Sequence, residues 1–178
     1  MADNSEVLNG ISKRDDVVYS VLTPNLKGFE SALIHKDQFH QLEVVIFGSA
    51  SEAFSQKNIN CSIDESIERF APVAEMAKAN GIKVRGVISC TVGCPYEGDI
   101  SPEKVAYVTK KLVDIGAEHI GVADTIGVGT PLKVQKALDA SLRYIDIDNI
   151  SGHFHDTYGQ ALSNTLAALQ MGVWQFDT

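Results

Sequence analysis

Six short apolar runs recur along the chain, separated by longer stretches in which apolar and polar residues alternate with a helical period. Each run is rich in Val and Ile and is bounded by Gly, Asn, Asp or Ser, which is typical of β-strands. Few positions in the runs are polar, so we expect parallel strands that are covered on both faces. The predicted strands are residues 17–23, 43–48, 82–89, 119–124, 148–155 and 172–177.

The stretches between the runs carry signals for helix ends. Ser62 and Glu65 have the spacing of a capping box, and Ser101 and Thr130 each place a capping hydroxyl before a proline. Glycines that suit left-handed caps precede the next strands at Gly81, Gly116 and Gly172. The chain therefore predicts an α/β fold with crossover helices. An eight-stranded barrel and an open doubly wound sheet both satisfy this pattern.

No linker divides residues 1–178, so we expect one domain. The longest irregular stretch, residues 90–102, lies between a strand and a helix, where α/β proteins carry functional loops. Residues 1–12 predict the end of a helix without a strand before it, and residues 172–177 predict a strand without a helix after it. An incomplete barrel fits these ends, and a six-stranded open sheet is the alternative.

The composition excludes several classes of partner. The net charge is −8 and only 15 of the 178 residues are Lys or Arg, which argues against a nucleic-acid surface. No apolar run approaches the roughly 18 residues of a membrane span. The polar start "MADNSEVLNG" does not predict a signal peptide. We therefore expect neither a nucleic acid nor a membrane as partner.

The three cysteines are Cys61, Cys90 and Cys94, an odd number that suits a reducing compartment. No second cysteine pair completes a closed zinc site with Cys90 and Cys94, so buried small side chains are favoured. Cys94 lies in a glycine-bearing loop and is a candidate nucleophile. The neighbouring Glu97 and Asp99 predict a raised pKa for its thiol, which argues against that role.

His153 and His155 are the strongest candidates for chemistry. Residues i and i+2 of a strand point to the same face, so both imidazoles face one direction and suit one metal ion. They also lie at the carboxyl end of their strand, where barrels and doubly wound sheets place active sites. The alternative is two packed histidines, each bonded to a backbone carbonyl, because two ligands are too few for any metal.

Two further positions have open interpretations. Asp124 ends a predicted strand and could bind a metal, orient a metal-bound histidine or cap the next turn. The glycines of "DTIGVGTP" that follow it match no phosphate-binding motif. Asn58 and Asn60 could donate to a ligand or shape the turn before Ser62.

Four motifs together resemble the 3-hydroxy-3-methylglutaryl-CoA lyase family: "KNINCS" (57–62), "GCPYEG" (93–98), "DTIGVGTP" (124–131) and "HDTYGQAL" (155–162). The resemblance covers almost the whole chain. It implies an incomplete (β/α)8 TIM barrel with about six parallel strands, the third to the eighth of the barrel. The related isopropylmalate and homocitrate synthases usually follow the histidine pair with Asn-Asp, so "HFHDTYG" favours the lyase.

The resemblance also implies a reaction and a set of site residues. The lyases cleave 3-hydroxy-3-methylglutaryl-CoA, an acyl-CoA, into acetyl-CoA and acetoacetate with Mg²⁺ or Mn²⁺. By resemblance His153 and His155 bind the metal, and His153 and Asp124 are catalytic. Asn58 and Thr125 are expected to contact the substrate.

Departures from the family pattern limit this expectation. The family takes an arginine and a ligating aspartate from its first strand, and an asparagine ligand and a catalytic cysteine from beyond its last. None has a counterpart here, so we expect the chain alone to be inactive and the full-length enzyme to be an active homodimer. Its compartment would be the cytoplasm in a bacterium or the mitochondrial matrix in a eukaryote. A related acyltransferase and a non-catalytic truncated product are the alternatives.

A short insertion at residues 34–40 also departs from the family. It falls in a helix-to-strand connection, where we expect His35 and His40 to be solvated.

Overall fold

The computed structural model describes residues 3–177, which form one sheet of six parallel strands and a separate two-stranded hairpin. All six predicted strands are present, within three residues at either end. The sheet strands are β1 (Val18–Leu22), β2 (Gln41–Ser49), β3 (Lys83–Ser89), β6 (His119–Asp124), β7 (Ile150–Phe154) and β8 (Gln175–Asp177).

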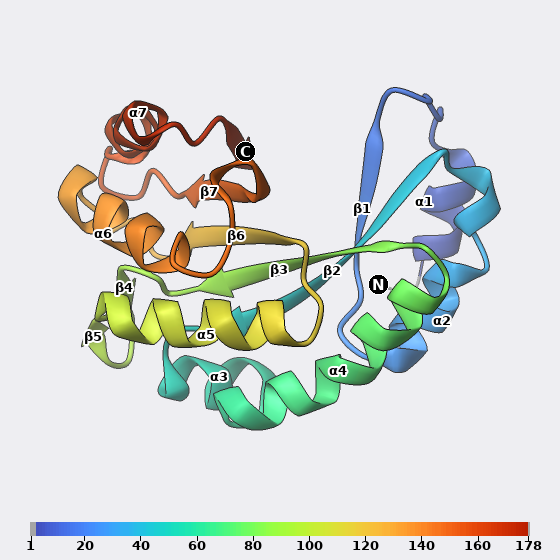
Figure 1. The fold of residues 1–178 in the computed structure, drawn as a ribbon, viewed down its shortest axis with the longest axis horizontal. Coiled ribbons are helices and arrows are strands. Elements are labelled where there is room, and N and C mark those ends of the chain that lie inside the picture. Colours follow the sequence, from blue (N-terminus) through green and yellow to red (C-terminus); the bar gives the residue numbers. More distant parts are fainter. Residues whose placement is uncertain (1–2, 178) are drawn as a thin grey trace.

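The order of the strands in the sheet distinguishes a barrel from a doubly wound fold. The order is β1-β2-β3-β6-β7-β8, so each new strand joins the same edge. In a doubly wound sheet the strand order reverses at a switch point, after which strands are added at the opposite edge, whereas in a barrel each strand is added at the same edge. The sheet curls with the helices on its outer side, as in part of a TIM barrel (Figure 1). The fold is therefore the expected incomplete barrel.

The helices begin and end largely where the capping signals predict. Ser62 and Glu65 form both hydrogen bonds of a capping box, and Ser101 caps its helix through Lys104 N. Thr130 is the N-cap residue of its helix, as predicted, but its hydroxyl makes no capping hydrogen bond. The three glycine caps have positive φ as predicted. The α-helices are α1 (Asn4–Gly10), α2 (Leu26–Leu33), α3 (Glu52–Ile59), α4 (Ile63–Ala79), α5 (Pro102–Asp114), α6 (Pro131–Ser141) and α7 (Ala161–Met171).

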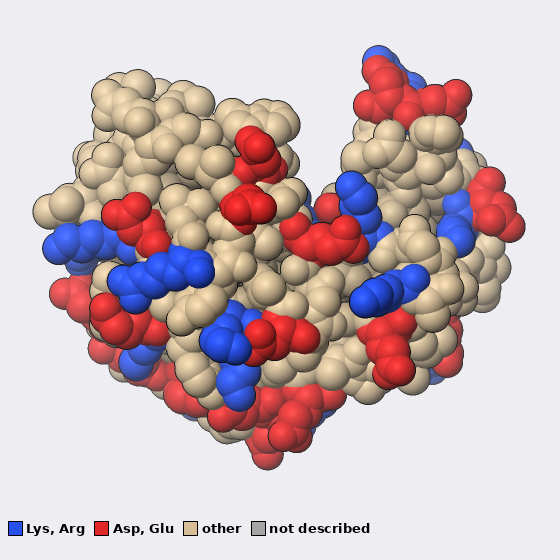
Figure 2. Space-filling model, viewed as in Figure 1, with Lys and Arg blue, Asp and Glu red and all other residues tan. Residues whose placement is uncertain are grey.

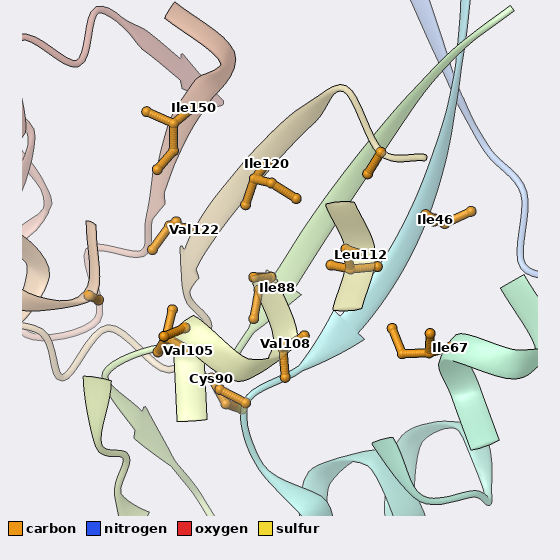
Figure 3. Close-up of a cluster of buried hydrophobic side chains, with 14 of the residues drawn as sticks. Ile46, Ile67, Ile88, Cys90, Val105, Val108, Leu112, Ile120, Val122 and Ile150 are labelled. Carbon is orange, nitrogen blue, oxygen red and sulfur yellow. The ribbon is translucent and has the colours of Figure 1, made fainter. Parts of the chain in front are cut away.

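The main hydrophobic core lies between the outer face of the sheet and the helices. Alternate strand residues such as Ile46, Ile88 and Ile120 are fully buried there. They face Val108 and Leu112 of α5 and other helix residues (Figure 3). The inner face is more polar and partly exposed, contrary to the expectation that both faces are covered. Its residues include Arg85, His119, Ser151, His153 and Asp177.

The irregular stretch 90–102 contains a small hairpin of β4 (Gly93–Cys94) and β5 (Gly98–Asp99), which the sequence did not predict.

All three cysteines are buried and free, as expected.

Residues 34–40 form the 3-10 helix η1 (Lys36–Gln38). A second 3-10 helix, η2 (Ile147–Asn149), precedes β7. His40 is exposed, but His35 is buried, 3.2 Å from Ser5 Oγ and 3.0 Å from Gln38 Nε2, so its expected solvation is wrong.

No helix within residues 3–177 is long and apolar enough to cross a membrane.

Candidate active site

His153 and His155 lie together at the carboxyl end of β7. Their Nε2 atoms are 3.0 Å apart, so both rings point to one position in space. His153 is partly buried and His155, just past the strand, is exposed. Neither bonds a backbone carbonyl among the described residues, which removes the main support for two merely packed imidazoles.

The separation of the two nitrogens fits a shared cation. Two neighbouring ligands of an octahedral ion at about 2.0–2.1 Å lie about 2.9 Å from each other, close to the observed distance. Neutral imidazole nitrogens are common ligands of divalent metals. Within residues 3–177, however, no group of three or more His, Cys, Asp or Glu could hold a metal ion. The pair therefore fits part of a coordination sphere.

A network that the sequence did not predict lies beside the histidines on the inner face. Arg85 Nη2 of β3 donates to Asp177 Oδ1 at 2.7 Å and Oδ2 at 2.5 Å, and to Ser151 Oγ at 2.7 Å. Asp177 Oδ2 is 3.8 Å from His153 Nδ1. An arginine within the apolar run "IKVRGVIS" was the available signal, but it did not identify the partners on other strands.

Two histidines of the inner face have lowered pKa values. Burial lowers the pKa of His119 to about 4, aided by the positive charge of Arg85 and opposed by Asp177. Burial is also the main cause that lowers the pKa of His153, again opposed by Asp177. In both rings the surroundings favour the neutral form.

Asp124 is on the other face of the sheet from His153. In the register of β6 and β7, Asp124 pairs with Phe154 and Ala123 pairs with His153. The Asp124 carboxylate is fully buried and accepts from Val128 N at 3.1 Å and Gly129 N at 2.8 Å. These contacts give Asp124 an anchoring role in the loop after β6, and its catalytic role stays a prediction.

Of the two predicted substrate contacts, Thr125 directly follows the carboxyl end of β6 and Asn58 lies on a helix. Thr125 Oγ1 accepts from Cys90 N at 2.7 Å and so ties the loop after β6 to the end of β3. Asn58 is exposed on α3, the helix that follows β2, and within residues 3–177 no hydrogen bond joins it to the histidines. Asn60 caps α3 with φ 52°, which supports a turn-shaping role. Substrate binding by Asn58 and Thr125 stays a prediction.

The expectation of a raised pKa for the Cys94 thiol is wrong. Burial raises this pKa, but hydrogen bonds from the Ser51 hydroxyl and the backbone N–H groups of Tyr96 and Glu97 outweigh burial and lower it. The Glu97 carboxylate instead accepts from Ala53 N and Lys104 Nζ, both at 2.7 Å. Sequence proximity was misleading here because the hydrogen bonds to the sulfur depend on Ser51 and on the loop backbone, which the spacing of Glu97 and Cys94 does not indicate.

The concave side of the molecule is open between the arm that carries β1 and the arm that carries β7, with acidic and basic side chains at its margin (Figure 2). A separate hollow at the amino ends of the strands is lined by Gln41, Lys83 and His119 among others. Because barrel sites lie at the carboxyl ends, the histidine pair is the stronger candidate.

The curled parallel sheet with paired histidines at its carboxyl end defines an α/β protein of the TIM-barrel class with a candidate metal site. The family model HMGL-like matches residues 2–178, and the chain belongs to this family. It is similar to hydroxymethylglutaryl-CoA lyase, mitochondrial, from Bos taurus, with 56% identity over 178 residues, 100% of this chain and 54% of the bovine one.

Solved structures show the same likeness. The hydroxymethylglutaryl-CoA lyase of Pseudomonas aeruginosa superposes with a TM-score of 0.93 at 48% identity, covering 100% of this chain and 58% of that one. A lyase from Acinetobacter baumannii, solved with coenzyme A and 3-methylmalate, has a TM-score of 0.89 at 32% identity, covering 99% and 56%. The chain thus spans about half the length of the curated relatives it matches.

Proposed function

We propose that residues 1–178 form part of the active site of a metal-dependent hydroxymethylglutaryl-CoA lyase. The reaction would cleave 3-hydroxy-3-methylglutaryl-CoA into acetyl-CoA and acetoacetate. The observation that carries the proposal is the 3.0 Å approach of His153 Nε2 and His155 Nε2 at the carboxyl end of β7. The whole chain is also 56% identical to a lyase of that name.

The lyase family is metal-dependent in general, and we propose Mg²⁺ or Mn²⁺ as the cation. When bound, a divalent cation lowers the cost of negative charge on the hydroxyl and carbonyl oxygens of the substrate. His153 and His155 would hold the ion. We propose His153 as a catalytic residue as well, because its ring would lie beside the metal-bound substrate hydroxyl whose proton the cleavage removes.

The remaining site residues are proposed from their places in the fold. Thr125, at the carboxyl end of the sheet, would contact the substrate, as would Asn58 on the helix after β2. Asp124 would serve the reaction through the loop 125–129 that its carboxylate holds. A relative's structure with coenzyme A supports an acyl-CoA as substrate.

We further propose an assignment of the strands and of the whole protein's context. The six strands would be the third to the eighth of the barrel, within one domain at residues 1–178. The complete enzyme would be a homodimer, in the mitochondrial matrix if eukaryotic, as the name of the bovine relative indicates for that protein, or in the cytoplasm if bacterial.

A chimera tests the function directly. Residues 1–178 would replace the matching segment of the Pseudomonas aeruginosa lyase, and acetoacetate release would be measured with Mg²⁺ or Mn²⁺. We expect metal-dependent cleavage, and a loss of at least about 100-fold when His153 or His155 is changed to Ala, because each change removes a proposed metal ligand and His153→Ala also removes a proposed acid–base group. The exposed Leu162→Ala variant is the matched control.

The alternatives give different results in the same assay. A chimera that folds and condenses acetyl-CoA with a 2-oxo acid would replace the lyase by an acyltransferase. A folded chimera without either activity would favour a non-catalytic product. For the 178-residue chain alone we expect weak Mn²⁺ binding and little turnover, since ligand loss lowers affinity strongly. Normal turnover by that chain would contradict this expectation.

A further inference from the structure

His153 has a carboxylate on the side of its ring that faces away from the other histidine. His153 Nε2 is 3.0 Å from His155 Nε2, whereas His153 Nδ1 is 3.8 Å from Asp177 Oδ2. His153 and Asp177 are register partners on the neighbouring parallel strands β7 and β8, so the backbone holds the two side chains next to each other. The arrangement is carboxylate, imidazole, then the proposed metal position.

Asp177 is itself held in place from across the sheet. Arg85 contacts both of its carboxylate oxygens and also donates to Ser151 Oγ. Arg85 reaches these partners from β3 across β6, where Gly121 has no side chain to obstruct it. A Cβ on Gly121 would lie 3.5 Å from Arg85 Nη2 and 3.4 Å from Ser151 Oγ. The side chains of Arg85 and Asp177 are only 15% and 31% exposed, so water competes little for this pairing.

We propose that Asp177, fixed by Arg85 and Ser151, is a positioning residue that accepts Nδ1–H of His153 and so keeps His153 Nε2 unprotonated and turned toward the metal position. Metal-bound histidines commonly donate their second ring nitrogen to a carboxylate, which sets the tautomer and the ring orientation. The 3.8 Å distance would shorten on metal binding, as hydrogen bonds at such sites often do. This inference rests on the proposed function for the identity of the metal site.

The main test uses Asp177→Asn in the 178-residue chain with labelled histidine. At pH 8 and without metal, NMR should show the Nδ1–H tautomer of His153 in the wild type. The amide of the variant would keep its oxygen toward Arg85 and present its N–H groups to Nδ1, so the tautomer should change to Nε2–H, as amide replacements of such carboxylates do. Gln175→Ala, on the same strand and face but bonded to Asp148 O, is the control and should change nothing.

Titration with Mn²⁺ alone, followed by line broadening of the imidazole signals, gives the second measurement. We expect Asp177→Asn to weaken Mn²⁺ binding about 10- to 100-fold, the usual effect of losing such a partner, and Gln175→Ala to leave it unchanged. If Asp177→Asn does not fold, Arg85→Met keeps the carboxylate but removes its support. A mixture of tautomers is then the expected result.

The outcomes separate the two proposals. If His153 has the Nδ1–H tautomer but no Mn²⁺ binds at the pair, the metal site of the proposed function fails and the positioning role stands. If Mn²⁺ binds and the Asp177 and Arg85 variants change neither tautomer nor affinity, the positioning role is overturned and the metal site stands.

Discussion

The two faces of the curled sheet are made of alternate residues of the same strands but obey different physical rules. On the outer face, Ile88 and Ile120 are completely buried against helices, and any apolar side chain of similar volume would give most of the same stabilisation. On the inner face, Arg85, Ser151 and Asp177 depend on particular donors and acceptors on other strands. The outer face therefore contributes most of the apolar burial, and the inner face carries the proposed site.

The largest effect should come from the outer face. Leu112 of α5 is fully buried, and its Cδ1 would lie 3.0 Å from a Cβ at Gly86 and 3.7 Å from one at Gly48, so it packs directly on β2 and β3. Leu112→Ala should lower the free energy of unfolding by about 2–5 kcal/mol through lost burial and a cavity. Urea denaturation measures the change.

Leu162→Ala is the matched control for Leu112→Ala, because Leu162 is 83% exposed. Its effect should remain within about 0.5 kcal/mol. Equal losses at the two leucines would contradict the assignment of the core to the outer face.

A pH titration tests His119, which lies on the inner face at the amino end of β6. The pKa of His119 is about 4 because of burial and of Arg85, below the usual value of 6.5. Protonation therefore favours the unfolded chain, so stability is complete above about pH 6.5 and declines as the pH falls toward 4. His119 should account for about 1–3 kcal/mol of that decline.

The measurement compares the free energy of unfolding of the wild type and of His119→Gln at pH 7 and pH 4.5. The variant should lose less stability over this interval. His40→Gln, at an exposed position, should behave as the wild type. If the wild type and His119→Gln lose the same free energy of unfolding between pH 7 and pH 4.5, protonation of His119 does not affect stability in this interval.

The third effect concerns Asp124, which lies on the side of the sheet opposite to His153. Asp124→Asn replaces one of two acceptor oxygens by an amide nitrogen that faces a backbone N–H of Val128 or Gly129. The expected loss is about 1–2 kcal/mol, since a buried donor is left without a partner. Thermal unfolding checks it, and Mn²⁺ affinity should not change. A variant of full stability with weaker Mn²⁺ binding would reverse this interpretation.

The outer face explains why the sequence predicted so much of the fold. The runs that became β2, β3 and β6 are apolar at the positions that face the helices, and the caps at Ser62 and Ser101 depend on residues close in sequence. Thr130 has the same local pattern as Ser101, but its hydroxyl makes no cap. Local sequence patterns therefore predict where helices and strands lie better than they predict individual side-chain hydrogen bonds.

The site was predictable only where its geometry is local. His153 and His155 share a face because they are two residues apart, and the structure confirms that their rings meet. Asp177 lies far from His153 along the chain and reaches it through the register of β7 and β8, which no short motif encodes. The register of β6 with β7 likewise determines that Asp124 lies on the opposite face of the sheet from His153.

The smallest effect tests whether the path across β6 must remain open. In Gly121→Ala the new Cβ would lie 3.3 Å from Val87 Cγ2 and at ordinary contact distances from Ser151 and Arg85. The mild crowding is offset by the lower entropy of the unfolded chain, so stability should change by less than about 1 kcal/mol. The His153 tautomer should not change either. Gly121→Leu, by contrast, would place branched methyl groups at the Arg85 guanidinium and should disturb the tautomer as Arg85→Met does. Suppose instead that Gly121→Leu leaves the tautomer of His153 unchanged while Arg85→Met alters it. The side chain of Arg85 would then reach Asp177 without passing over residue 121, and a large side chain would be tolerated at that position.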